Sequence, residues 1–145
     1  MSPAPRVIDL PFSAKRLDRR AVSIVSQLRQ AGHETYLVGG CVRDLLLDLS
    51  PKDFDIATSA TPQQVRRVFG RRSRIIGKRF PIVHVRNHQE IYEVATFRSA
   101  PKKSKETKTL ARDTNYGTVE SDALRRDFAI NALYLDPQSL KIYDW

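Results

Sequence analysis

The stretch TYLVGGCVRDLLLDLSPKDFDIAT, residues 35–58, decides the fold because it places two strands around a glycine turn and a short helix. Residues 35–38 are a short apolar strand that the Gly39-Gly40 pair interrupts. The apolar residues over 42–47 follow helical spacing, and residues 52–58 predict a second strand. Strands that alternate with helices in this way are typical of mixed α/β domains.

The flanking segments extend this pattern in both directions. Asp18 is a predicted helix N-cap, and Thr61 to Gln64 has the form of a capping box with proline at the first helical position. We expect further helices over 18–31, 62–69 and 121–131 and further strands over 74–76, 81–85, 90–98, 133–135 and 141–143. The sequence thus predicts an α/β or α+β domain with a small mixed sheet over residues 16–145. We expect an N-terminal arm over 1–15 and a mobile loop over 99–115.

Size and composition describe one ordinary globular domain. The chain has 145 residues, no apolar run long enough for a membrane span and no secretory signal, so we expect no membrane partner. A single cysteine, Cys41, excludes an internal disulfide and fits a cytoplasmic location.

The charge indicates a polyanionic partner. Twenty-five basic against sixteen acidic residues give a net charge of +9, and residues 56–89 hold eight basic side chains and no acid. Each of these residues, taken alone, fits a solubilising surface. Taken together they favour contact with the phosphates of nucleic acid or nucleotides, and we expect Arg66, Arg67, Lys78 and Arg79 to bind RNA.

Two motifs in the central stretch are suited to phosphate and metal chemistry. The amides of Gly39 and Gly40 and the nearby Arg43 can face a phosphate at a helix N-terminus, although a plain tight turn explains them equally well. Asp53 and Asp55 lie two residues apart on a predicted strand, so their carboxylates share one face. Such a pair is suited to holding Mg²⁺ against a triphosphate, while a solvent-facing strand edge is the alternative.

A third motif, Arg125-Arg126-Asp127, lies on the last predicted helix. The two arginines are suited to phosphates, and Asp127 to supporting a metal or a hydroxyl group. An amphipathic helix with ordinary surface ion pairs is the alternative interpretation.

Together the three motifs resemble the head domain of the bacterial poly(A) polymerase and tRNA CCA-adding nucleotidyltransferase family, over Leu17 to Trp145. The resemblance implies a polymerase-β-like palm in which Asp53 and Asp55 bind two Mg²⁺ ions. It further implies that Gly40 and Arg43 contact the nucleotide phosphates, that Arg126 lies near the nucleotide, and that Asp127 is a third acidic active-site residue. Ala129 stands where the family often has threonine.

The segment from Ile75 to Val85 is similar to the signature that separates poly(A) polymerases from CCA-adding enzymes, with Gly77 before a basic pair and an aromatic residue. The resemblance therefore implies transfer of AMP from ATP to RNA 3′ ends. CCA addition to tRNA and a non-catalytic RNA-binding module remain alternatives. The family's helical neck, body and tail domains are not expected within these residues, and base recognition is expected in the neck.

Glu93 lies among apolar residues on the strand predicted over 90–98. Such a glutamate either faces the active-site side or pairs with an arginine. We expect a supporting structural role for it in preference to direct catalysis, because buried ion pairs also place charges in such positions.

Overall fold

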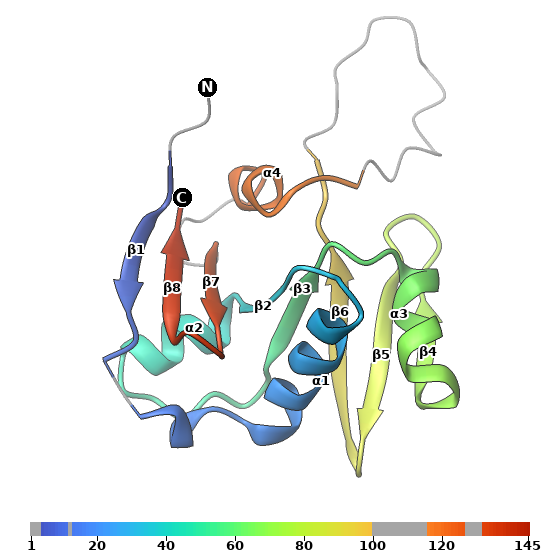
Figure 1. Cartoon of the computed structure of the whole chain (residues 1–145), viewed down its shortest axis with the longest axis horizontal. Helices are drawn as coiled ribbons and strands as arrows, with labels where there is room; N and C mark the ends of the chain where they lie inside the picture. The colour runs from blue at the N-terminus through green and yellow to red at the C-terminus, as the bar shows by residue number, and fades with distance from the viewer. Residues whose placement is uncertain (1–3, 12, 100–115, 127–131) are drawn as a thin grey trace, which may run out of the picture.

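The computed structural model describes residues 4–11, 13–99, 116–126 and 132–145, and shows an eight-stranded mixed sheet with helices against it (Figure 1). The helices are α1 Arg19–Gln30, α2 Gly40–Leu46, α3 Pro62–Phe69 and α4 Val119–Leu124, with 3-10 turns at Ala14–Arg16 and Gly70–Arg72. The strands are β1 Arg6–Asp9, β2 Thr35–Val38, β3 Asp55–Thr58, β4 Ser73–Ile76, β5 Ile82–Asn87, β6 Glu90–Thr96, β7 Leu133–Asp136 and β8 Lys141–Asp144. The predicted α/β class is confirmed.

The strand order is β1-β8-β7-β2-β3-β6-β5-β4. Strands β3 and β6 pair in parallel, and the other pairings between named strands in the described residues are antiparallel. The parallel pairing requires a crossover, which α3 and the β4–β5 hairpin supply. This pairing places β3, with Asp55 at its start, in the middle of the sheet.

Local sequence signals set the helix starts. The Asp18 carboxylate accepts a hydrogen bond from the Arg20 amide at 2.9 Å and begins α1. Thr61 and Gln64 form a reciprocal capping box, with Pro62 at the first helical position of α3. Such caps satisfy amides that have no partner within the helix. No helix in the described ranges is long and apolar enough to span a bilayer.

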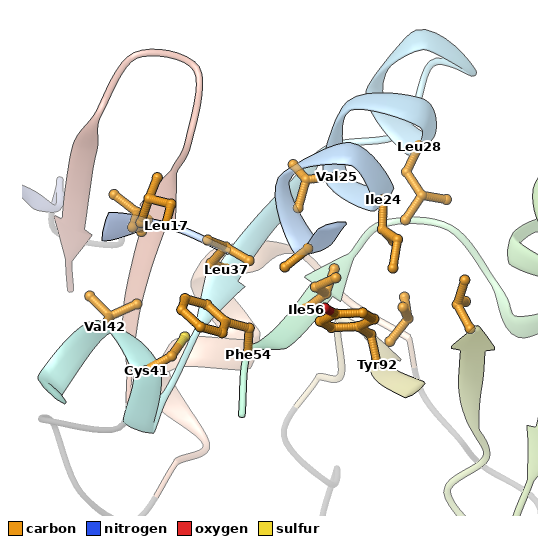
Figure 2. Packing of buried hydrophobic residues seen from close by; sticks show 14 of the residues in the cluster. Leu17, Ile24, Val25, Leu28, Leu37, Cys41, Val42, Phe54, Ile56 and Tyr92 are labelled. Carbon is orange, nitrogen blue, oxygen red and sulfur yellow. The ribbon is translucent and has the colours of Figure 1, made fainter. Parts of the chain in front are cut away.

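Alternation along the strands separates two cores, one on each face of the sheet. Leu37 and Ile56 join the larger core, which also buries side chains of α1, α2 and α3 (Figure 2). Their neighbours Val38 and Ala57 join the smaller core, which buries Val119 and Ala123 of α4 together with Tyr134. Successive strand residues point to opposite faces, so the side chains of Val38, Asp55 and Tyr134 share one face. We call this face the site face.

Part of the expected N-terminal arm belongs to the sheet. Residues 6–9 form β1, which pairs antiparallel with β8, and Arg6 forms an ion pair with Asp144 at 3.1 Å. Residues 1–15 contain three prolines and show no sustained periodicity, a pattern that predicts an arm. The partner strand β8 lies at the other end of the sequence, so no local pattern indicates that residues 6–9 form a strand.

Two predicted elements have different bounds. The strand expected over 52–58 begins only at Asp55, because β3 pairs with the four residues of β2, and the turn at Gly39 ends that partner strand. The helix expected over 121–131 starts at Val119 with Thr118 as its N-cap, so Ser121 is the third helical residue of a capping box and not the cap. It ends at Leu124, so Arg125 and Arg126 follow the helix and do not lie on it. The predicted mobile loop, from residue 100 onward, and residues 127–131 lie outside the described part of the chain.

Candidate active site

The glycine turn brings Arg43 against the start of α2. Gly39 has a φ of 84°, which strongly favours glycine, and its amide donates to the carbonyl of Leu133 at 3.3 Å. A methyl group on Gly40 would lie 3.2 Å from Nη2 of Arg43, so the guanidinium lies over the bare Cα. Arg43 also pairs with Asp44 at 3.2 Å and is partly exposed. Because the Gly39 amide is already bonded, Gly40 and Arg43 are the expected phosphate contacts that this turn still offers.

The two aspartates of the central motif occupy different backbone settings. Asp55 is the first residue of β3, opposite Val38, whereas Asp53 lies in the connecting segment before the strand. Both residues are accessible to solvent at the rim of a pocket of about 330 Å³, which partly encloses the Asp55 carboxylate. The predicted shared orientation therefore depends on the loop conformation as well as on strand alternation.

Asp55 lies in an electrostatically crowded position. Partial burial, followed by the negative charges of Glu93 and Asp53, raises the pKa of the Asp55 carboxyl group, and Arg126 partly offsets this effect. The negative charges of these neighbours repel the Asp55 carboxylate, and a cation beside it would remove the repulsion. The Asp55 carboxylate is thus affected both by the neighbouring acidic side chains and by Arg126, which follows α4.

Glu93 faces this cluster. Ile56 of β3 pairs in parallel with Val94 of β6, so Asp55 and Glu93 occupy adjacent positions on the site face. On its other side Glu93 is opposite His84, with 3.6 Å between Oε1 and Nε2. Glu93 thus lies on the site face, and its partner in the described residues is a histidine and not the arginine that was one of the two expected settings.

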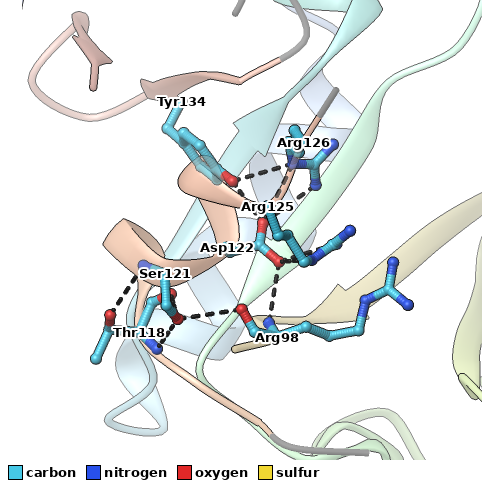
Figure 3. Close-up of polar contacts among 7 residues, drawn as sticks. All are labelled: Arg98, Thr118, Ser121, Asp122, Arg125, Arg126 and Tyr134. Carbon is cyan, nitrogen blue, oxygen red and sulfur yellow. Dashed lines mark hydrogen bonds and ion pairs between the residues drawn. The ribbon is translucent and has the colours of Figure 1, made fainter. Parts of the chain in front are cut away.

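Arg126 is held by a buried carboxylate. The Asp122 side chain is only 2% exposed and pairs with Arg126 at 3.2 Å and with Arg125 at 3.0 Å (Figure 3). It also accepts hydrogen bonds from the Tyr134 hydroxyl and from the Arg98 amide, the latter at 3.0 Å. These contacts fix the orientation of both arginines toward the site face.

The ionisation of Asp122 follows from the same contacts. Burial alone would raise the pKa of its carboxyl group. The hydrogen bonds from Tyr134 and Arg98 and the charges of Arg126 and Arg125 outweigh burial, and they hold the pKa below its ordinary value. Asp122 is therefore charged at neutral pH. We call its buried carboxylate the hub, because Arg98, Arg125, Arg126 and Tyr134 all contact it.

Sequence reasoning missed Asp122, Tyr134 and Arg98. The spacing of Asp122 three and four residues before the arginine pair is a signal for helical ion pairs, and it could have identified the hub. Tyr134 lies on β7 and Arg98 follows the end of β6. Their positions beside Asp122 are set by the folded sheet and leave no signal in the nearby sequence. Asp127 lies outside the described residues.

The donor set suits a hard divalent cation. Asp53 and Asp55 offer carboxylate oxygens, the ligands that Mg²⁺ prefers, and the repulsion around Asp55 is the signature of clustered anions. Within the described ranges no group of three or more histidine, cysteine, aspartate or glutamate residues is placed to hold a metal ion. Asp53 and Asp55 stay the residues predicted to hold a cation.

The four residues expected to bind RNA fall into two places. Arg66 and Arg67 are exposed on α3, whose Val65 and Phe69 pack into the larger core on the face opposite the site face. Lys78 and Arg79 are exposed in the loop between β4 and β5, beside Phe80. The structure does not bring the α3 pair to the aspartates.

Comparison with known proteins places this arrangement in a family. The family model of the Poly A polymerase head domain matches residues 35–145. Poly(A) polymerase I of Haemophilus influenzae is 45% identical over 92% of this chain and 31% of its own length. The CCA-adding enzyme of Listeria innocua is 38% identical over 86% of this chain and 31% of its length. The chain thus spans about a third of the length of these curated relatives.

Solved structures show the same fold. The Bacillus stearothermophilus CCA-adding enzyme in complex with CTP is 35% identical, with a TM-score of 0.70, and the match covers 87% of this chain and 29% of that one. A CCA-adding enzyme in complex with ATP, 21% identical with a TM-score of 0.67, supports the fold alone. The matched residues include the glycine turn, the two aspartates and the arginine pair, and the chain belongs to the poly(A) polymerase head-domain family.

Proposed function

We propose that the chain is the catalytic head of a template-independent RNA nucleotidyltransferase that transfers AMP from ATP to RNA 3′ ends in the cytoplasm. The observation that carries the proposal is the position of Asp55, which borders one pocket with Asp53 and Glu93 and lies within the electrostatic influence of Arg126. Carboxylates for metal ions and an arginine for phosphates therefore meet on one face of the sheet, as a nucleotide triphosphate requires.

In the proposed reaction, the 3′-hydroxyl oxygen of RNA attacks the α-phosphorus of ATP. A new P–O bond forms, the bond to the pyrophosphate oxygen breaks, and the hydroxyl proton is released. Arg43 and Arg126 would orient the triphosphate, so that the leaving oxygen lies in line with the attacking one. Asp127 would assist the hydroxyl group or the metal.

Asp53 and Asp55 would hold two Mg²⁺ ions. When bound, these ions would lower the pKa of the 3′-hydroxyl and neutralise charge on the triphosphate and the leaving pyrophosphate. The contribution of the chain itself is to hold the carboxylates and Arg126 in place before the substrate arrives, because rigid placement reduces the cost of ordering them. Lys78, Arg79, Arg66 and Arg67 would add affinity for the RNA backbone without reading its sequence.

Two alternatives remain. CCA addition uses the same catalytic groups, and the relatives named CCA-adding enzymes support it. The resemblance of residues 75–85 to the poly(A) polymerase signature, and the 45% identity to Poly(A) polymerase I, favour AMP transfer. A non-catalytic RNA-binding module would have no use for clustered acids beside an arginine, because carboxylates repel RNA phosphates.

The test is product analysis with this protein, a 5′-labelled RNA and Mg²⁺. We expect extension with ATP alone that lengthens with time, and no extension by the Asp55→Asn variant. Extension that requires CTP and stops after a few nucleotides would assign CCA addition. RNA binding with no extension under any nucleotide would contradict the proposed transfer activity of these residues and favour the binding module.

A further inference from the structure

Three arginines contact the buried carboxylate of Asp122, Arg125 and Arg126 through their side chains and Arg98 through its backbone amide. Arg98 follows the end of β6, and Arg125 and Arg126 follow α4, so the three come from two distant parts of the chain. In Figure 3 their guanidinium groups extend to the same side of the hub. The Arg98 amide donates to one Asp122 oxygen, which ties the end of β6 directly to the arginine pair.

The charges of this cluster do not balance. Asp122 forms ion pairs with Arg125 and Arg126, whereas the Arg98 guanidinium lies 4.3 Å from the centre of the half-exposed Phe80 ring. In the part of the chain that the structure describes, no carboxylate lies within ion-pair distance of the Arg98 guanidinium. Among the described residues, Asp122 is therefore the one carboxylate that forms ion pairs within this cluster of three positive side chains.

The three arginines lie close enough to repel one another. Partial burial and the positive charges of Arg125 and Arg126 lower the pKa of Arg98, and Asp122 only partly compensates. Arginine remains charged at physiological pH in spite of such a shift. The repulsion is therefore present in the folded protein and would be relieved by an anion with several charges.

The cluster is also connected to the catalytic aspartates. Arg126 is near enough to Asp55 for its charge to lower the Asp55 pKa. An anion held by the three arginines would therefore lie next to the nucleotide site and not at a separate surface. The Asp122 carboxylate and the Tyr134 hydroxyl hold Arg126 in its orientation, so the site exists before a ligand binds.

We propose that Arg98, Arg125 and Arg126 form one binding site for the polyphosphate tail of the nucleotide, with Arg98 as a third arginine that extends the arginine pair. This inference rests on the proposed function. A polyphosphate concentrates several negative charges on adjacent groups, which suits three crowded guanidinium groups. A single RNA strand carries one charge per nucleotide along its length and matches such crowding less well.

The experiment is a calorimetric titration of the protein with inorganic tripolyphosphate, Mg-ATP and a short oligoadenylate, at constant ionic strength. The variants are Arg98→Gln and Arg98→Lys, and the matched control is Arg86→Gln, an exposed arginine on β5. We expect Arg98→Gln to weaken tripolyphosphate and Mg-ATP binding about tenfold or more. Arg98→Lys should lose less, because it keeps the charge but not the fork of donors. Arg86→Gln should bind both ligands as the wild type does.

The outcomes separate this inference from the proposed function. If Arg98→Gln binds tripolyphosphate as tightly as the wild type does, the inference is wrong. It is also wrong if Arg98→Gln loses affinity only for the oligoadenylate, because Arg98 would then bind RNA. If Arg98→Gln does not fold, as shown by its melting curve, Arg98→Lys decides by the same criteria. If polyphosphate binding depends on Arg98 but the protein transfers no nucleotide, the binding site is supported and the proposed function is contradicted.

Discussion

Asp55 of β3 and Glu93 of β6 lie side by side on the site face, one residue before Ile56 and Val94, which pair in parallel. Neighbouring strands lie about 4.8 Å apart, so two carboxylates in adjacent positions repel each other. Burial is the main cause of the raised pKa of Asp55, and Glu93 makes the largest charge contribution to it. The fold therefore maintains an unfavourable cluster, which is the arrangement that a cation site requires before the cation is bound.

The first prediction concerns this cluster. Asp55→Asn should weaken Mg-ATP binding at least tenfold, because a bound cation loses one of its carboxylate ligands. The melting temperature should stay the same or rise, because the substitution removes repulsion between neighbouring acids. Calorimetry with and without Mg²⁺ measures the first effect, and thermal unfolding the second. The control is Asp9→Asn, on the exposed edge strand β1. If Asp55→Asn binds Mg-ATP as tightly as Asp9→Asn does, Asp55 is not a ligand of the cation.

The two glycines of the turn should respond differently to alanine. Gly39→Ala should destabilise the protein by about 1–3 kcal/mol, because its φ of 84° is strained for any residue with a Cβ. Gly40→Ala should leave stability nearly unchanged, since the only close neighbour of the new methyl group is the movable end of Arg43. Gly40→Ala should nevertheless weaken nucleotide binding, because Arg43 must shift. Denaturant titration and calorimetry on both variants test the pair, and a stable Gly39→Ala would contradict the backbone argument.

The third prediction concerns the buried hub. Asp122→Asn should cost about 3 kcal/mol of unfolding free energy, because it leaves two arginines without their shared counter-ion. The exposed pair of Arg6 and Asp144 provides the control, and Asp144→Asn should cost at most about 1 kcal/mol. Urea unfolding at pH 7 measures both, and equal costs would show that Asp122 is no more important than a surface partner.

The pH dependence of the hub has a definite sign. The pKa of folded Asp122 is lowered, so its stabilising effect is complete above the unfolded value of about 4 and is lost as the pH falls through the folded value. The wild type should therefore lose stability more steeply than Asp122→Asn below about pH 4, and the two should converge. Parallel stability curves between pH 7 and pH 3 would contradict the lowered pKa.

We also predict weak base discrimination. The groups proposed for nucleotide binding, Arg43, Arg126 and Arg98, address the phosphates that all nucleotides share. Selection between bases needs polar groups that the wrong base leaves unpaired. Calorimetric dissociation constants for Mg-ATP and Mg-CTP should therefore agree within about tenfold, which corresponds to 1.4 kcal/mol. A larger preference for ATP would place base recognition within these 145 residues.

The secondary structure was predictable wherever its signal is local. The caps at Asp18 and Thr61 and the glycine turn depend on residues within a few positions of one another, and the structure confirms them. The bounds of β3 and the existence of β1 were not predictable in this way. Both depend on pairing partners that are distant in the sequence, as Arg6 and Asp144 are.

The sequence by itself determined the family and the chemistry that its motifs predict, because the glycine turn, the aspartates and the arginine pair are contiguous motifs whose residue types limit what they can bind. Only the tertiary structure decided which groups meet. The parallel pairing of β3 and β6 brought Glu93 to Asp55, and the hydrogen bond from the Arg98 amide to Asp122 brought β6 to α4. Such contacts join segments far apart in the chain, and their electrostatic effects exist only at the short distances that the folded sheet imposes.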